Sequence, residues 1–280
     1  QLQGWATKPD RHFRGQICLG EYYNVSGYKC LPICFMHTMA HDIPCYHQLG
    51  ARHFHYMHVT TGDWGTKALT NYQMARQTWD VHTDCEALWQ DYFTGRYGPA
   101  AEAMRQFYES LERMLANVSE LKYGLASRLD RGVEDLFPTS HLRYRREPGV
   151  TCDGITLVEI VEHAAAARQV IDRVRAGDLP ERIVRRVAED ERTFTYAERT
   201  IAYYHACVQA FQQARGGRQE EARRHYAEAR RLAERLRQDT TSTTLSSEHA
   251  NAPNALAASG AAGALAHLAK LLEPPHAAPK

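Results

Sequence analysis

The chain of 280 residues lacks the features that mark several large classes of protein. Its 34 basic and 33 acidic residues give a net charge of +1, which offers little electrostatic support for non-specific binding to nucleic acid. No apolar run approaches the roughly 20 residues of a membrane-spanning helix. We therefore expect no nucleic-acid partner and no membrane association. Hydrophobic residues make up 44% and charged residues 24%, which excludes an intrinsically disordered chain.

The N-terminus lacks both an initiator methionine and the pattern of a signal peptide. The opening residues, QLQGWATKPD, contain neither a basic region nor an apolar stretch, and a start at Gln1 suggests that the chain begins inside a longer protein. The seven cysteines are odd in number and scattered, which fits free thiols better than a disulfide framework. Free thiols favour a reducing compartment such as the cytoplasm, and no other signal assigns a location.

Histidine is unusually frequent between residues 37 and 58, but no metal-binding signature accompanies it. His37 and His41 are four residues apart, a spacing that places both on one face of a helix and that metals can use. There is no HExxH motif and no carboxylate at the spacing of a third ligand, and Cys30 and Cys34 do not form a CxxC pair. We expect neither a metal nor another cofactor, and we interpret these histidines as packed or hydrogen-bonded side chains in a polar cleft.

The segment 1–98 has the pattern of a parallel α/β structure. The predicted elements are a strand at 16–23, helical residues through 31–49 that end at Gly50, a strand at 51–59, a polar loop at 60–65 and a helix at 67–79. Asp84 then caps a further helix, which Gly98-Pro99 ends. A strand, a helix and a second strand in this order are typical of a βαβ unit in a parallel sheet.

The segment 99–280 is predicted to be a bundle of helices. Apolar residues recur at spacings of three and four over 100–126, 157–176, 180–216, 219–238 and 255–272. The aromatic residues on this pattern are interpreted as core: Tyr196, Tyr203, Tyr204 and Phe211. The charged runs are interpreted as solvated faces: Asp190-Glu191-Arg192, Arg223-Arg224 and Arg230-Arg231. The polar stretch 239–254 is long for a connection between helices and is left without an assignment.

One acidic residue lies where a parallel sheet usually carries its site. Glu21 is near the end of the first strand and is followed by Tyr22 and Tyr23. Active sites of (β/α)₈ barrels form at the carboxyl ends of the strands, and a carboxylate among aromatic rings suits glycoside chemistry. Glu21 is thus the candidate catalytic residue, with the two tyrosines as sugar-binding side chains. A strand-end glutamate that faces solvent or pairs with an arginine explains the same pattern equally well.

The second strand ends in a similar way. Asp63 and Trp64 follow it in the equivalent loop, and an acid beside an indole can bind a sugar, although Asp-Trp-Gly also suits an ordinary turn. His55 and His58 lie near the end of this strand, and His58 is closer to the loop. His58 is therefore the better candidate to hydrogen-bond a substrate hydroxyl.

A recurrent motif series connects the two segments. Trp79-Asp80 is followed by an Asp84-capped helix with Asp91-Tyr92-Phe93, then by Tyr97-Gly98-Pro99-Ala100 and a helix containing Met104 and Phe107. This series resembles the end of the barrel in a bacterial glycosidase-like family filed as domain of unknown function 4838, which is related in fold to α-glucuronidases and β-N-acetylhexosaminidases. The resemblance covers about residues 15–110, and Tyr-Gly-Pro-Ala is not itself a catalytic signature.

The resemblance implies a fold that is α/β plus all-α: the C-terminal portion of a (β/α)₈ barrel in 1–98, with its last two or three βα units, followed by an α-helical domain in 99–280. It also implies a carbohydrate substrate or ligand for a glycoside-hydrolase-like protein, catalytic only if the missing N-terminal part of the barrel is present. A whole barrel needs roughly 250 residues, so the catalytic set is incomplete here. Two alternatives remain open: a non-catalytic carbohydrate-binding protein and a helical scaffold or interaction module. The oligomeric state is not indicated.

Overall fold

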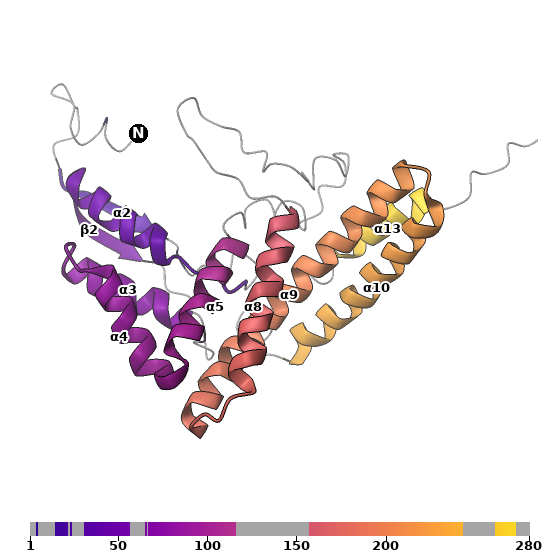
Figure 1. Ribbon diagram of the computed structural model, residues 1–280. Helices are drawn as coiled ribbons and strands as arrows, with labels where there is room; N and C mark the ends of the chain where they lie inside the picture. Colours follow the sequence, from indigo (N-terminus) through magenta and orange to yellow (C-terminus); the bar gives the residue numbers. More distant parts are fainter. Residues whose placement is uncertain are drawn as a thin grey trace, which may run out of the picture.

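The computed structural model describes residues 15–21, 31–56, 67–115, 157–242 and 261–272, together with Gly4, Tyr23 and Gly65. Figure 1 shows the α/β elements at one end of the molecule and the long helices at the other. In chain order the elements are β1 (Ile17–Glu21), α2 (Met36–Gln48), β2 (Ala51–Tyr56), α3 (Lys67–Trp79), α4 (Cys85–Tyr97), the 3₁₀ turn η2 (Gly98–Ala100), α5 (Ala101–Met114), α8 (Leu157–Arg175), α9 (Glu181–Arg215), α10 (Gln219–Ser242) and α13 (Ala261–Leu272).

The two strands pair in parallel, and α2 connects them. The register aligns Ile17 with Ala51 and Glu21 with Tyr56, so both strands end at the same edge. After α2 the chain turns into β2 at Gly50, whose φ of 96° is readily adopted only by glycine. The predicted βαβ unit is confirmed, and its helix ends where the sequence pattern placed the end.

The coarse fold class is also confirmed, because an α/β unit is followed by helices. Within the described residues, however, the sheet has two strands, β1 and β2. Closing a barrel of this kind takes eight strands, so these residues do not form a barrel by themselves. They correspond to two βα units, β1–α2 and β2–α3.

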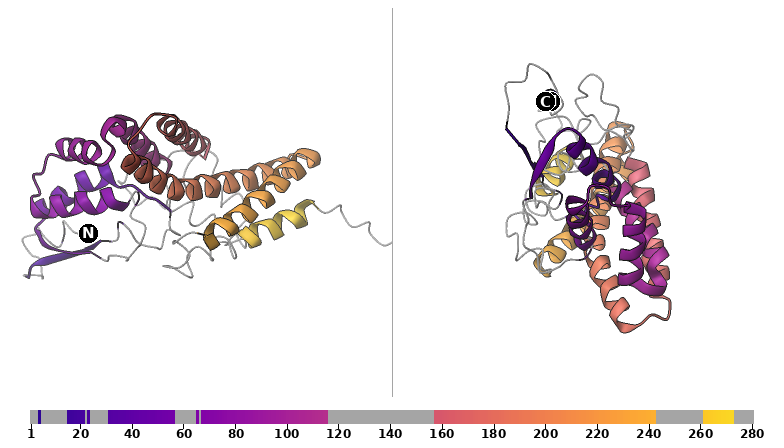
Figure 2. Two further views of the ribbon diagram at one scale, coloured as in Figure 1. Left: turned by 90° about the horizontal axis from the view of Figure 1, so that it is seen from below. Right: turned by 90° about the vertical axis from the view of Figure 1, so that its left-hand side faces the viewer.

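The long helix α9 organises the helical part of the molecule. Over its length it packs against α4, α8, α10 and α13, while α5 packs against both α4 and α8 (Figure 2). Its buried side chains recur in a three-four spacing that includes Ile183, Val187, Phe194, Ala197 and Ile201. Such a stripe is typical of a helix packed between neighbours.

The aromatic residues of α9 follow the sequence interpretation. Tyr196, Tyr203 and Tyr204 are buried, and Phe211 packs against the same core while partly exposed. The expectation that they serve as core residues is confirmed.

The main hydrophobic core is continuous across residue 98. Leu31, Leu69 and Phe93 belong to the same buried cluster as Phe107 and Phe194. Phe107 on α5 meets Phe194 on α9 edge to face, with ring centroids 5.3 Å apart. The α/β elements and the helices therefore share one core, and the domain boundary at 98/99 stays a prediction.

The junction between α4 and α5 depends on a glycine. The helix α4 begins at the predicted cap, where the Ala87 backbone N–H donates to Asp84 Oδ1 over 3.1 Å, and it ends at Gly98. Gly98 has φ 52° and ψ −118°, a conformation that side chains with a Cβ rarely adopt. A Cβ on Gly98 would also lie 3.0 Å from Ile183 Cδ1 of α9. The backbone turns here while α9 packs closely against it.

We predict that Gly98→Ala (G98A) lowers the free energy of unfolding by about 1–3 kcal/mol, because the new methyl group meets both backbone strain and Ile183. Chemical denaturation followed by circular dichroism measures this difference. Gly95→Ala is the matched control, because Gly95 lies in α4 with open space around its Cα. The control should be neutral or more stable by up to about 1 kcal/mol. Equal effects of the two substitutions would contradict the role of Gly98.

Candidate functional site

The carboxyl edge of the β1–β2 pair carries Glu21, the strand-end acid that the sequence singled out. Glu21 is half-buried and lies opposite Tyr56 in the parallel register. The hydroxyl of Tyr46, near the end of α2, donates a hydrogen bond of 2.7 Å to Glu21 Oε1. Within the described residues, Glu21 thus pairs with a tyrosine rather than with an arginine.

Burial changes the chemistry of the tyrosines beside Glu21. The pKa of Tyr46 is raised by burial and by the hydrogen bond to Glu21. The pKa of Tyr23 is raised by burial and by the nearby Glu21 charge. Both hydroxyls therefore keep their protons at neutral pH and remain hydrogen-bond donors.

Tyr23 is largely buried in a small apolar cluster with Met39 and Ile43, and its side chain is 5% exposed. Its ring lies 5.3 Å from that of Phe35. Within the described residues its hydroxyl makes no hydrogen bond of good geometry, which leaves a buried donor beside Glu21. The structure therefore brings together Glu21, Tyr23 and Tyr46. The sequence analysis did not identify Tyr46, because it lies 25 residues from Glu21 and no motif connects the two.

The other predicted site residues, Tyr22, His58, Asp63 and Trp64, lie outside the described residues. The structure does place Gly65, which follows Trp64 directly. Its backbone N–H donates to Glu189 Oε1 of α9 over 3.0 Å, and Glu189 Oε2 lies 3.0 Å from Arg96 Nη2 of α4. Gly65, between β2 and α3, is thus tied to the long helix by one glutamate.

A buried carboxyl group lies next to this glutamate. Asp190 is fully buried, and it accepts hydrogen bonds from Tyr97 (2.5 Å, from α4) and Tyr108 (3.1 Å, from α5). Arg96 Nε donates to the Tyr97 hydroxyl over 3.0 Å. Burial raises the pKa of Asp190 to about 7, although Arg96 and the two tyrosines oppose that rise.

The sequence interpretation of Asp190 as part of a solvated charged face is wrong. Asp190 occupies one position of the buried stripe, seven residues after Ile183 and four before Phe194. Its neighbours Glu191 and Arg192 are more exposed, so the three charged residues in sequence do not share one solvated face. The three-four periodicity alone was a signal that could have identified it.

The histidine-rich region forms pairs. His37 Nδ1 lies 2.6 Å from Glu112 Oε2 of α5, and the His37 backbone N–H donates to the other carboxylate oxygen over 3.0 Å. Burial raises the pKa of Glu112, and the hydrogen bonds from His37 oppose this rise. His41 contacts Asp42 at 3.1 Å, and His53 hydrogen-bonds with Gln16. These three histidines are hydrogen-bonded, as expected, and His37 and His41 have separate carboxylate partners.

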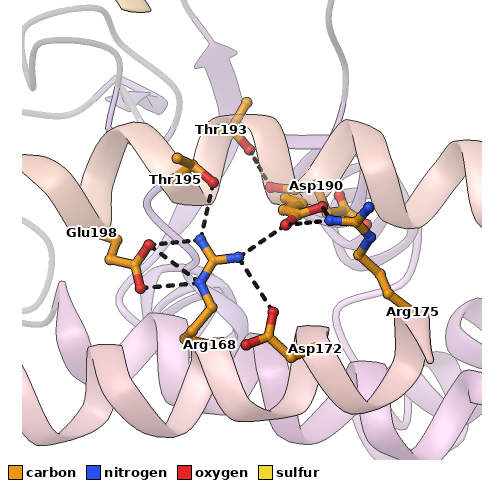
Figure 3. Close-up of polar contacts among 8 residues, drawn as sticks. Arg168, Asp172, Arg175, Asp190, Thr193, Thr195 and Glu198 are labelled. Carbon is orange, nitrogen blue, oxygen red and sulfur yellow. Dashed lines mark hydrogen bonds and ion pairs between the residues drawn. The ribbon is translucent and has the colours of Figure 1, made fainter. Parts of the chain in front are cut away.

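A second polar cluster joins α8 to α9 (Figure 3). Arg168 of α8 donates to Glu198 at 2.6 Å, to Glu191 at 2.9 Å and to Thr195 at 3.0 Å, all on α9. Arg175 also pairs with Glu191, at 3.0 Å. Each charge in the cluster meets an opposite charge, and the guanidinium of Arg168 lies over the ring of Phe194. The cluster therefore serves to hold two helices together.

In the described ranges, no three side chains of histidine, cysteine, aspartate or glutamate are grouped so that they could hold a metal ion. None of the described helices combines the length and the apolar character needed to cross a membrane. No family model matches the chain, and neither a curated protein nor a solved structure is significantly similar to it. The resemblance to the glycosidase-like family therefore stays a prediction that rests on the motif residues.

We predict a pH-dependent effect of Asp190→Asn (D190N). Because the pKa of Asp190 is raised to about 7 in the folded state, its favourable contribution is complete below about pH 4 and is lost as the pH rises to about 7. The free energy of unfolding of D190N minus that of the wild type should therefore increase over this range, by an amount on the order of a few kcal/mol.

Urea unfolding at several pH values between 4 and 8 measures this difference. The exposed Asp178, between α8 and α9, provides the control D178N for removal of one carboxylate. A difference between D190N and wild type that stays constant across the range would disprove the assigned titration of Asp190.

Proposed function

We propose that this chain is the C-terminal part of a glycoside-hydrolase-like protein that acts on carbohydrate. The observation that carries the proposal is the carboxylate of Glu21 at the carboxyl edge of a parallel strand pair, hydrogen-bonded to Tyr46 and close to the buried Tyr23. In parallel α/β folds, ligands bind outside the carboxyl ends of the strands.

The side chains at this edge match the chemistry of sugars. A carboxylate accepts hydrogen bonds from sugar hydroxyls, and in glycoside hydrolysis it faces the anomeric centre as a nucleophile or activates water. The hydrogen bond from Tyr46 holds the Glu21 side chain in one orientation. In this proposal Tyr22, His58, Asp63 and Trp64 add stacking surfaces and polar contacts around the same edge.

Catalysis of glycoside cleavage takes a second carboxyl group beside the first. We assign that group, and the remaining strands of a (β/α)₈ barrel, to sequence outside these 280 residues. The described residues would then supply two of the barrel's βα units and the helices that support them. The contact from Glu189 to Gly65 supports this arrangement, because it joins α9 to a residue between β2 and α3.

A binding protein without catalysis is the second candidate. It is favoured by a buried hydroxyl, that of Tyr23, which lacks a hydrogen bond of good geometry in the described residues. Such an edge can hold a sugar by hydrogen bonds without cleaving it. The two candidates differ in the effect of removing the charge of Glu21.

We predict that Glu21→Gln (E21Q) in the native protein lowers hydrolysis of its carbohydrate substrate by about 100-fold or more, since charge and proton transfer at one carboxylate contribute on this scale. Sugar binding should be largely retained, because an amide still accepts and donates hydrogen bonds. Release of reducing ends from a panel of polysaccharides and calorimetric binding measure the two effects. Tyr46→Phe should give a smaller loss, of about tenfold, because it removes one hydrogen bond to Glu21.

Glu220→Gln, on the exposed first turn of α10, is the matched control and should leave both quantities unchanged. Loss of binding in E21Q without any hydrolysis in the wild type would favour the binding protein. If E21Q hydrolyses and binds the carbohydrate as well as the wild type does, Glu21 is not part of the site.

A further inference from the structure

An open groove of about 510 Å³ lies along the first half of α9 and is lined mainly by arginine. Its lining residues are Arg182, Arg185, Arg186, Ala188, Glu189 and Arg192. The four arginines and one glutamate give this surface an excess of positive charge on a chain whose overall net charge is +1. The positive charge of the groove is therefore offset by acidic residues elsewhere in the chain.

Two of these arginines are available to a ligand. Arg182 and Arg185 are exposed, and neither has a hydrogen bond or ion pair to another described residue. Arg186 instead donates to the backbone oxygens of Gly95 and Arg96, over 3.3 Å and 2.7 Å, at the end of α4. Arg186 thus fixes the wall of the groove, while Arg182 and Arg185 present free guanidinium groups.

The positions of these arginines are unfavourable for α9 itself. Arg182, Arg185 and Arg186 all lie within the first two turns, where the helix dipole already places positive charge. Arg185 and Arg186 lie three and four residues after Arg182, so that like charges meet on the helix surface. An anionic ligand in the groove would relieve both repulsions, and this is the physical reason to assign one.

The arrangement suits a polymer better than a single small anion. At 1.5 Å of rise per residue, the distance along α9 from Arg182 to Arg185 is about 4.5 Å, so the two exposed guanidinium groups lie on neighbouring turns. Guanidinium groups bind carboxylates with paired hydrogen bonds, and a row of them matches a chain with repeated carboxylates. Among the lining residues there is no aromatic ring on which a nucleic-acid base could stack, which favours an acidic polysaccharide over single-stranded nucleic acid.

The groove shares one residue, Glu189, with the contact that α9 makes to Gly65. Glu189 lines the groove, and the same side chain accepts the hydrogen bond from the Gly65 backbone N–H after β2. A polysaccharide bound beside Gly65 would therefore lie near a residue that lines the groove.

We infer that the arginine groove on α9 binds acidic, carboxylate-bearing segments of the polysaccharide on which the proposed site acts. The inference rests on the proposed function and adds the substrate class to it. Arg182 and Arg185 are the residues that contact the carboxylates, and Arg186 positions the wall of the groove.

The test compares oligogalacturonate with the same oligomer after methyl esterification, which removes its charge and keeps its sugar backbone. We expect the wild-type chain to bind the acidic oligomer at least tenfold more tightly than the ester, and the double variant R182Q/R185Q to lose most of this difference. The variant R223Q/R224Q removes two exposed arginines from α10 and should keep it. Calorimetry at two salt concentrations gives the affinities, and circular dichroism establishes that each variant is folded.

Equal binding of acid and ester, or an unchanged preference in R182Q/R185Q, would overturn the inference. Tighter binding of a DNA oligonucleotide of matched charge would also overturn it in favour of a nucleic-acid partner. If the chain binds the ester, shows no preference for the acid, and loses affinity in E21Q, the proposed function stands and the role assigned to the groove is contradicted. Acid binding that depends on Arg182 and Arg185 but not on Glu21 would support the groove and contradict the proposed site.

Discussion

The buried carboxyl group of Asp190 is the interaction on which the rest of the arrangement depends. It receives hydrogen bonds from Tyr97, the last residue of α4, and from Tyr108 within α5, while Asp190 itself lies on α9. A buried carboxyl group is costly unless it is hydrogen-bonded, so these three helices are held in one relative position. Gly98 contributes to the same arrangement of α4, α5 and α9, because it lets the backbone turn close to Ile183 of α9.

The residue before Asp190, Glu189, makes further contacts between α9 and other elements. Glu189 precedes Asp190, and its position on the adjoining face allows it to hold both Arg96 and the backbone of Gly65. Glu189 also lines the arginine-rich groove on α9. The long helix α9 therefore holds Gly65, between β2 and α3, and the end of α4 through one side chain.

Local patterns in the sequence predicted the elements well. Periodicity indicated the βαβ order and the long helices, Asp84 was correctly identified as a cap, and the tyrosines of α9 were correctly placed in the core. Contacts between distant segments were not predictable in this way. Glu112 and His37 are 75 residues apart, and Tyr46 and Glu21 are 25 residues apart, so that no local spacing in the sequence predicts either contact. Asp190 was misplaced because its charged neighbours outweighed its position on the apolar stripe.

The central claim is that one surface, from the strand edge to the first turns of α9, contacts carbohydrate. Hydrogen–deuterium exchange of the whole chain, with and without oligogalacturonate, tests it most directly because the readout needs no substitution. The account predicts slower exchange in peptides from 16–21 and 51–56 and in those covering 181–192, with little change in α10 and α13. Protection confined to α10 and α13, or none at a saturating concentration of the oligomer, would contradict it.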